Sequence, residues 1–351
     1  MQMWAVVKNG QPLQRLEVET PTPTGSEVLV EVTHCGVCHS DLHFWEGDYN
    51  LGYGKRVNLA DRGVQLPRAP GHEVVGTVVA FGEQVEGIRR GDQRIVFPWI
   101  GCGRCTWCED GQDNLCSQLS SIGVVRHGGF SSHVLVPHWR YLVDPDGIDP
   151  AIAATYACSG ITVLSAIRKL GRIDPDAAVL LIGAGGLGHS AIAMLRALGH
   201  RHIIVVDVDE RKRASVLQSG ATTFVNSGHD NLAEEIKRVA GGPLLYAMDF
   251  VNNTKTANAA FDTLGRGGKL VLIGLSGGEL DIPVAGMVFL PRSVIGSSTG
   301  TLQDLIDVVQ MAKTGQLQPI PVHRMHRDKA NEALSLLQTG DVNGRIVLQK
   351  A

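Results

Sequence analysis

The feature that most constrains the fold is an apolar strand, a glycine turn and a helix in direct succession. The segment "VLLIGAGGLGHSAIAM" places Gly183, Gly185 and Gly188 in the pattern G-x-G-x-x-G. Glycines at these positions allow a tight turn and a close approach of the backbone to a pyrophosphate, whose charge lies at the helix N-terminus. The pattern alone is weak in a chain with 42 glycines, but its place between a strand and a helix indicates a dinucleotide site.

A second apolar strand, "IIVVDVD", ends in Asp207, which lies 24 residues after Gly183. A carboxylate at about this spacing binds the hydroxyls of the adenosine ribose and repels a 2′-phosphate. The basic run "ERKR" that follows could neutralise such a phosphate, but basic residues on a helix usually form a solvated face. The sequence therefore predicts NAD rather than NADP. The alternative interpretation is a glycine-rich turn with an unrelated surface aspartate.

The order of the remaining segments predicts an α/β chain with two domains. From about residue 160 to 300, continuous apolar strands alternate with helices, which is typical of a doubly wound parallel sheet. The first 150 residues form short strands with turns, such as "SEVLVEVTH" and "HEVVGTVVAFG". In the tail we expect a helix from about Leu302 to Lys313, another near Asp328 to Gln338, and a final strand "GRIVLQ".

Composition and charge exclude several classes of protein. The net charge is −3, from 32 basic and 35 acidic residues without a basic block, so the chain offers little to attract nucleic acid. The longest apolar runs, such as "AIAATYACSGITVL", are interrupted and too short to span a bilayer, and the N-terminus lacks the pattern of a secretory signal. We therefore expect a cytoplasmic protein whose seven cysteines are ligands or buried thiols rather than disulfides.

Four of the cysteines are closely spaced in "CGRCTWCEDGQDNLC". Cys102, Cys105, Cys108 and Cys116 follow the pattern C-x2-C-x2-C-x7-C. Four thiolates in a segment with few apolar residues suit a closed tetrahedral zinc site that holds the segment in shape. An iron–sulfur centre and two disulfides are the rival interpretations, and a zinc ribbon for nucleic acid is disfavoured by the low basic charge.

The other three cysteines are Cys35, Cys38 and Cys158. Cys35 and Cys38, in "THCGVCHSDLHFWEGD", form a C-x-x-C that could be a redox dithiol, but they follow an alternating strand in the β-rich half rather than a βαβ unit. An open zinc site instead needs three protein ligands. Two further candidate ligands are His72 in "APGHEVVG" and Cys158 in "YACSGITV". Alone, such a histidine is more often structural and such a cysteine more often a core residue.

Taken together, "GVCHSDLH", "GHEVVG", the four-cysteine segment, "CSGIT" and "GAGGLG" resemble the zinc-dependent medium-chain alcohol dehydrogenases in order and approximate spacing. The resemblance covers nearly the whole chain and is closer to the tetrameric microbial branch than to the dimeric vertebrate one. It implies a GroES-like catalytic domain of residues 1–157 and 300–351, with a structural-zinc lobe at about 98–117. Residues 158–299 would form a Rossmann NAD-binding domain.

The function implied by this resemblance is reversible hydride transfer between a primary or secondary alcohol and NAD, giving an aldehyde or ketone. Two zinc ions per subunit and a homotetramer are implied as well. The alternatives are a polyol or sugar-alcohol dehydrogenase of the same superfamily and a non-catalytic zinc- and nucleotide-binding relative. Retention of the inner ligands together with Ser40 and His43 argues against the second alternative.

The resemblance also assigns roles around the catalytic metal. The zinc ligands would be Cys38, His72 and Cys158, while Cys35 would only pack. Ser40 and His43 would relay the proton of the alcohol through the nicotinamide ribose to solvent, and imidazole suits the outlet because it titrates near neutrality. Asp41 would hold the ring of the zinc-binding histidine. Glu73 would lie behind the zinc as a transient ligand.

Further assignments concern the cofactor and the substrate. The cofactor contacts implied by the resemblance are His39 near the pyrophosphate, Thr162 and Leu187 at the nicotinamide, Lys212 at the adenosine ribose and Arg345 at a phosphate. The substrate pocket would be lined by Tyr49, Trp99 and Leu275. The sequence departs from the shorter family form between Glu46 and Pro70, where "EGDYNLGYGKRVNLADRGVQLP" could rim the cleft or meet a neighbouring subunit.

Overall fold

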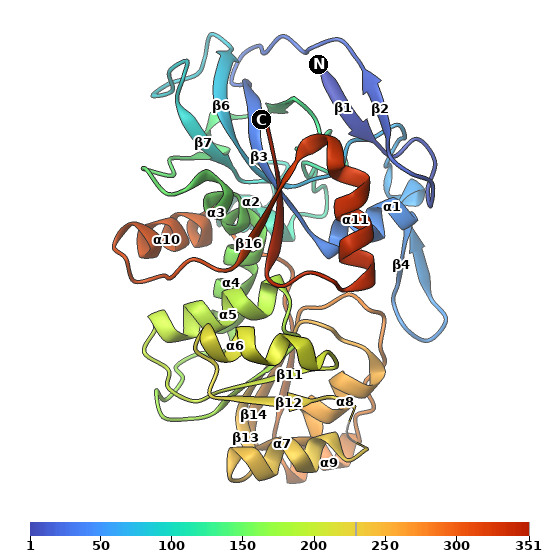
Figure 1. The fold of residues 1–351 in the computed structure, drawn as a ribbon, viewed down its shortest axis with the longest axis vertical. Coiled ribbons are helices and arrows are strands. Elements are labelled where there is room, and N and C mark those ends of the chain that lie inside the picture. Colours follow the sequence, from blue (N-terminus) through green and yellow to red (C-terminus); the bar gives the residue numbers. More distant parts are fainter. Residues whose placement is uncertain (229, 351) are drawn as a thin grey trace.

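The computed structural model describes residues 1–228 and 230–350, which form two parts built around two separate sheets (Figure 1). The lower part in the figure, here called the parallel-sheet domain, has six parallel strands in the order β12-β11-β10-β13-β14-β15. The strands are β10 (Val179–Ile182), β11 (Ile203–Asp207), β12 (Thr223–Asn226), β13 (Leu244–Asp249), β14 (Leu264–Leu272) and β15 (Ser293–Gly296). The strand order reverses at β10, and a doubly wound sheet binds its ligand at such a point.

Helices cover both faces of this sheet because its strands are apolar on both sides. Along β10, Val179 and Leu181 pack into one core cluster, while Leu180 and Ile182 pack into a second one on the opposite face. The helices of this domain are α4 (Ile161–Leu170), α5 (Gly186–Ala197), α6 (Arg213–Gln218), α7 (Leu232–Ala240), α8 (Thr254–Asp262) and α9 (Val284–Phe289). Full burial on both faces explains why these strands are continuously apolar in sequence.

The upper part, here called the β-rich domain, contains both described ends of the chain (Figure 1). Its main sheet has the order β16-β17-β3-β6-β7-β9, and β8 also pairs with β3. The strands are β3 (Val28–Val37), β6 (Glu73–Phe81), β7 (Gln93–Val96), β8 (His133–Val136), β9 (Leu142–Val143), β16 (Val322–His326) and β17 (Arg345–Gln349), beside a small sheet of β1 (Gln2–Ala5) and β2 (Gln14–Glu17). The C-terminal strand thus returns to pair with an N-terminal one, so this domain is built from two distant stretches of sequence.

A continuous helical stretch, Pro150–Leu170, joins the two domains. It consists of α3 (Pro150–Thr155), the π-helical turn η4 (Tyr156–Gly160) and α4. The expectation that the apolar run here is too short to cross a membrane is wrong, since the helical stretch is 21 residues long. However, 83% of its most apolar window is buried inside the protein, as in a core helix.

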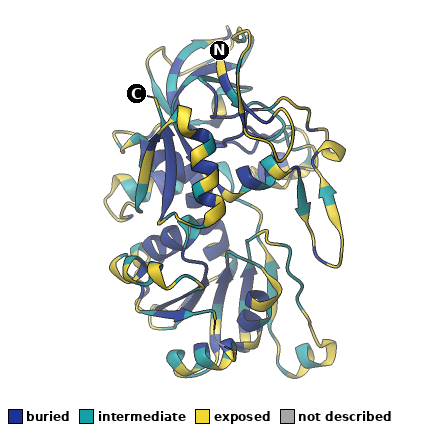
Figure 2. Ribbon diagram, turned by 45° about the vertical axis from the view of Figure 1, so that its right-hand side comes forward, coloured by how far each residue is buried: buried dark blue, intermediate teal, exposed yellow. Residues whose placement is uncertain are grey.

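The insertion after Glu46 forms a hairpin that reaches toward the parallel-sheet domain (Figure 2). Its strands are β4 (Asp48–Asn50) and β5 (Arg56–Asn58). At its tip the backbone N–H of Tyr53 donates to Glu279 Oε1 at 2.5 Å, and a Cβ at Gly277 would lie 2.5 Å from Cγ of Asn50. The insertion therefore touches the other domain of the same chain.

Most of the elements expected from the sequence are confirmed. Helix α10 runs Leu302–Lys313, α11 runs Ala330–Thr339 after the short turn η6 (Arg327–Lys329), and the final strand is β17. The doubly wound parallel sheet and the β-rich domain are both present. Sequence reasoning missed the helix α1 (His39–Glu46), which begins directly after the C-x-x-C. It also placed Cys35 after the alternating strand, whereas Cys35 lies within β3.

Candidate active site

Four side chains from three distant segments meet in one buried cluster. Ligand atoms of Cys38, His72, Glu73 and Cys158 all lie within 4.8 Å of one another. Cys38 is the N-cap of α1, and Cys158 lies in the π-helical turn η4. Glu73 is the first residue of β6, and His72 directly precedes it. All four are at most 6% exposed, and Cys35 is excluded from the cluster. The C-x-x-C therefore contributes one residue to this site rather than a dithiol.

Asp41 connects two of these segments. Its Oδ2 accepts the backbone N–H of Cys38 at 2.8 Å, and its Oδ1 accepts the backbone N–H of Gly71 at 2.9 Å. The same Oδ1 lies 3.5 Å from Nδ1 of His72. Gly71 has φ +92°, and a Cβ there would lie 2.7 Å from Sγ of Cys35, so the close approach requires glycine. One carboxylate thus fixes both the start of α1 and the histidine ring.

The donor atoms of the cluster fit a tetrahedral metal ion. Sγ of Cys38 and Sγ of Cys158 are 3.9 Å apart, close to the edge of about 3.8 Å expected for zinc–sulfur bonds of 2.3 Å. Nε2 of His72 is buried and has no hydrogen-bond partner among the described residues. Since buried polar atoms are normally satisfied, this nitrogen indicates a missing ligand. Two sulfurs and one nitrogen form the three-ligand set of an open site.

Proton sharing within the cluster supports the same interpretation. The thiol of Cys158 hydrogen-bonds to Cys38 and lowers the pKa of Cys38 well below its ordinary value, while this contact raises the pKa of Cys158. Burial opposes charge on the ring of His72, but the charge and hydrogen bond of Asp41 raise its pKa well above its ordinary value. A divalent cation would replace these shared protons, since metal ligands bind deprotonated.

Glu73 is engaged by a partner that the sequence did not reveal. Nε of Arg345 donates to its Oε2 at 3.1 Å, and Nη2 donates to its Oε1. Arg345 also faces the glycine turn, because a Cβ at Gly186 would lie 3.1 Å from its Nη1. Arg345 therefore lies between the candidate metal ligands and the expected phosphate site.

The second cysteine cluster lies in a separate lobe around α2 (Thr106–Glu109). Sγ–Sγ distances are 3.5 Å for Cys105–Cys108, 3.8 Å for Cys105–Cys116 and 4.0 Å for Cys102–Cys108. A hydrogen bond from the backbone of Arg104 lowers the pKa of Cys102 to about 6, which favours its thiolate form. Four sulfurs at this spacing could occupy all four positions of a tetrahedral metal ion, as in a closed site.

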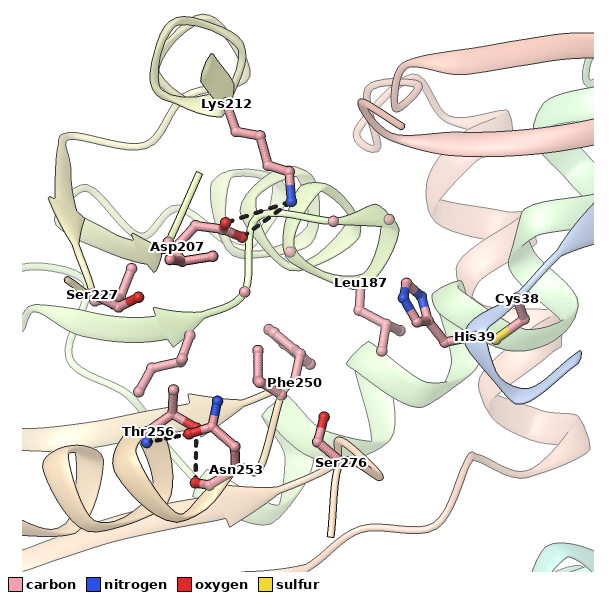
Figure 3. A pocket seen from close by; sticks show the side chains of 18 of the residues that line it. Cys38, His39, Leu187, Asp207, Lys212, Ser227, Phe250, Asn253, Thr256 and Ser276 are labelled. Atoms are coloured by element: carbon pink, nitrogen blue, oxygen red, sulfur yellow. Dashed lines mark hydrogen bonds and ion pairs between the residues drawn. The ribbon is translucent and has the colours of Figure 1, made fainter. Parts of the chain in front are cut away.

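A cavity of about 310 Å³ begins at the inner cluster and runs along the carboxyl end of the parallel sheet (Figure 3). Cys38, His39 and Leu187 stand at one end, and Asp207 and Lys212 stand at the other. The wall between them includes the glycine turn, where Gly183 has φ +105°. The cavity thus extends from the candidate metal ligand Cys38 to the expected ribose site at Asp207.

The carboxylate of Asp207 is held in place by hydrogen bonds from two backbone N–H groups and by an ion pair. Its Oδ2 accepts the backbone N–H of Ala184 at 2.7 Å, and its Oδ1 accepts the N–H of Asp209 at 2.9 Å. Nζ of Lys212 lies 3.5 Å from both carboxylate oxygens. The aspartate and lysine expected at the ribose are therefore in contact with each other (Figure 3).

The remaining expected residues are distributed around the cluster. Oγ of Ser40 lies 3.8 Å from Sγ of Cys38, and the ring of His43 packs at 5.2 Å from that of Tyr49, whose pKa is raised to about 12 by burial. The Trp99 ring lies 5.4 Å from that of His72. Thr162 is buried, and its Oγ1 has no partner among the described residues, whereas Leu275 is 48% exposed.

Sequence reasoning missed a group of residues that line the cavity. They are Ser227, Phe250, Asn253, Thr256 and Ser276. All follow the carboxyl ends of β12, β13 or β14, where a doubly wound sheet places its ligand contacts. Their position after apolar strands was the available signal.

Comparisons with known proteins agree with this geometry. Residues 24–146 match the family model "Alcohol dehydrogenase GroES-like domain", and residues 186–314 match "Zinc-binding dehydrogenase". An NAD-dependent alcohol dehydrogenase from Sulfurisphaera tokodaii is 34% identical over 99% of both chains. The crystal structure of the alcohol dehydrogenase from Aeropyrum pernix superposes with a TM-score of 0.90 at 30% identity, covering 99% of this chain and 100% of that one.

A sugar dehydrogenase is among the similar structures as well. The D-arabinose dehydrogenase from Sulfolobus solfataricus has a TM-score of 0.83 at 26% identity and 99% coverage of both chains. The expected combination of a GroES-like domain and a Rossmann-type sheet is confirmed. By its full-length similarity, the chain belongs to the zinc-dependent medium-chain alcohol dehydrogenase family.

Proposed function

We propose that this chain is an NAD-dependent alcohol dehydrogenase that interconverts primary or secondary alcohols with aldehydes or ketones. One observation carries this proposal. Cys38 belongs to the buried cluster of four potential metal ligands, and it also lines the cavity that is walled by the glycine turn and Asp207. A metal-bound alcohol and a dinucleotide would therefore meet at one end of one cleft, as hydride transfer between them requires.

For the metals, we propose that Cys38, His72 and Cys158 hold a catalytic zinc and that the four-cysteine lobe holds a structural zinc. When bound in the open site, zinc supplies a Lewis acid that favours the deprotonated form of an alcohol hydroxyl. Asp41 orients the imidazole so that Nε2 faces the two sulfurs. Glu73 would lie behind the zinc, and the guanidinium of Arg345 neutralises its charge.

For the proton, we propose that Oγ of Ser40 accepts it from the alcohol and that the ring of His43 releases it to solvent. The exposures support this direction, because the His43 side chain is 24% exposed whereas Cys38 and Cys158 are 6% exposed. An imidazole can exchange a proton with water near neutral pH. The proton would thus leave the buried site through a partly exposed titratable ring.

For the cofactor, we propose that the glycine turn binds the pyrophosphate and that Asp207 binds the adenosine ribose with Lys212. His39 and Arg345 line the same cavity from the β-rich domain and supply donors toward the phosphates. At the nicotinamide end we propose Thr162 and Leu187. Substrate specificity would come from Tyr49, Trp99 and Leu275.

The finer assignments follow from the resemblance to the microbial branch of the family. We propose a cytoplasmic homotetramer in which residues 1–157 and 300–351 form the catalytic domain and residues 158–299 the nucleotide-binding domain. The π-helical turn at the junction supports a rigid connection, since it is continuous with α3 and α4.

The test is NAD reduction with a panel of aliphatic, aromatic and cyclic alcohols, with zinc quantified per chain. We expect activity with two zinc ions per chain in the wild type. Cys38→Ser should lose one zinc and nearly all activity, while the matched control Cys35→Ser, from the same C-x-x-C, should keep both. Equal loss in both variants, or one zinc in the wild type, would contradict the assignment.

A sugar-alcohol or sugar dehydrogenase is the second candidate, favoured by the similarity to the D-arabinose dehydrogenase. The same panel should include sorbitol and D-arabinose. Higher kcat/KM with these polyols than with any simple alcohol would select this candidate. Tight binding of zinc and NAD without any turnover would instead indicate a non-catalytic relative.

A further inference from the structure

His189 is a fully buried polar side chain beside the nucleotide cavity that no step above uses. It lies on the first turn of α5, and its backbone N–H donates to the carbonyl of Gly185 at 3.0 Å. Its ring Nδ1 lies 3.0 Å from Oγ of Ser219, and its Nε2 lies 3.1 Å from Oδ1 of Asn343. Both ring nitrogens therefore have partners, and the contact of Nε2 with Asn343 is the one that reaches the β-rich domain.

Nε2 also lies 3.4 Å from Oγ of Ser215, a longer contact within the parallel-sheet domain. The two shorter contacts fix the tautomer of the ring. Oδ1 of Asn343 can only accept, so Nε2 of His189 carries the hydrogen. Nδ1 then accepts from the hydroxyl of Ser219. Burial lowers the pKa of His189, which keeps the ring in this neutral form. The bond between Nε2–H and Asn343 is thus directed across the boundary between the domains.

This bond lies on the seam where the glycine turn meets the chain before β17. A Cβ at Gly186 would lie 3.1 Å from the carbonyl of Gly344 and from Nη1 of Arg345. The backbone N–H of Arg345 donates to the carbonyl of Pro321, so the arginine is anchored in the β-rich domain. The phosphate end of the cavity is therefore assembled from two domains, and its width depends on how α5 sits against residues 343–345.

We propose that His189 is a positioning residue for the phosphate-binding part of the cleft, where its bond to Asn343 holds the glycine turn at a fixed distance from Arg345. This inference rests on the proposed binding of NAD. A leucine would fill the same buried space without desolvating two nitrogens, so packing alone does not call for histidine here. Losing the bond lets the two halves of the phosphate site separate, while the metal cluster is left intact.

The experiment is calorimetric binding of ADP-ribose to the zinc-loaded enzyme. His189→Leu and Asn343→Ala should each weaken binding about three- to tenfold, the effect of one net hydrogen bond. The double variant should bind no more weakly than His189→Leu, because that single variant has already lost the bond to Asn343. Asn343→Asp keeps an acceptor oxygen and should bind ADP-ribose more tightly than Asn343→Ala at high salt, where the repulsion between the added carboxylate and the phosphates is screened. In the steady state, KM for NAD should rise while kcat and zinc content stay close to wild type.

Adenosine, which lacks phosphate, serves as the second ligand, measured as a competitive inhibitor against NAD. Its inhibition constant should change less than twofold in the variants. His200→Gln is the matched control, since His200 is 6% exposed and lies just beyond the other end of α5. Unchanged ADP-ribose affinity in Asn343→Ala, or equal weakening of adenosine, would overturn the inference. A wild type that fails to bind ADP-ribose would instead refute the proposed function.

Discussion

Arg345 and Glu73 form a buried ion pair directly behind the candidate metal site. The guanidinium donates from Nε and Nη2 to the two carboxylate oxygens, with side-chain exposures of 5% and 0%. The pair joins the first residue of β17 to the first residue of β6, so it links these two strands across β3, which lies between them in the sheet. Removing one partner of such a pair leaves the other charge buried without compensation, which costs several kcal/mol of stability.

We therefore expect Glu73→Gln to destabilise the protein by about 3–5 kcal/mol, because it leaves the Arg345 cation buried without its anion. Urea unfolding of the zinc-loaded protein measures this change. The control is Glu31→Gln, which removes an ion pair with Lys350 whose partners are 32% and 53% exposed, and it should cost at most about 1 kcal/mol. Equal costs for both variants would show that burial of the pair has no special effect.

Asp41→Asn should weaken zinc binding at the inner site about 10- to 100-fold, the usual effect of losing a carboxylate that orients a histidine ligand. The amide keeps the shape of the side chain but offers one acceptor oxygen in place of two. Competition with a chromogenic chelator measures the affinity. The four-cysteine lobe is an internal control in the same chain, so one zinc per chain should be retained. Loss of both ions together would indicate general unfolding.

His43→Gln should slow turnover at neutral pH and slow it much less at high pH, where hydroxide can accept the proton directly. An imidazole can take up and release a proton near neutrality, which an amide cannot. The measurement is the pH profile of kcat with saturating alcohol and NAD. His323→Gln, at an exposed histidine of β16, is the control. If the two profiles coincide with that of the wild type, His43 is not in the relay.

Asp207→Asn should reduce the preference for NAD over NADP at least about tenfold in kcat/KM. The amide keeps an oxygen for the N–H of Ala184 while removing the charge that repels a 2′-phosphate. Lys212, which now lies 3.5 Å from the carboxylate, would become available to that phosphate. An unchanged ratio would mean that selectivity against NADP arises elsewhere in the cavity.

Cys108→Ser should remove the lobe zinc and lower the thermal midpoint while leaving the inner zinc bound. The lobe contains the short elements α2 and η2 (Asp113–Leu115), which bury little apolar surface of their own. Zinc per chain and the melting temperature are measured on the same sample. Retention of two zinc ions would contradict the four-sulfur site.

The sequence predicted the elements whose signals are local. The alternation of strands and helices and the glycine turn require only short-range patterns, and α10 was predicted within its observed bounds. The three inner ligands lie in segments that no local pattern joins, so they were grouped only by resemblance to a family. The pairing of Glu73 with Arg345 and the bond of His189 to Asn343 span more than 150 residues. The first contact depends on how distant strands assemble into one sheet, and the second on how the two domains pack. Local patterns determine neither.

The π-helical turn that carries Cys158 has a consequence for how this site tolerates change. A π turn contains one residue more than an α turn, and each residue rotates a helix by about 100°. Deleting Tyr156 or Ala157, which precede Cys158 in this turn, would let α3 and α4 merge into one regular helix. Cys158 and Thr162 would then point in directions offset by that rotation relative to α3, so the sulfur would leave the cluster although no ligand had been replaced.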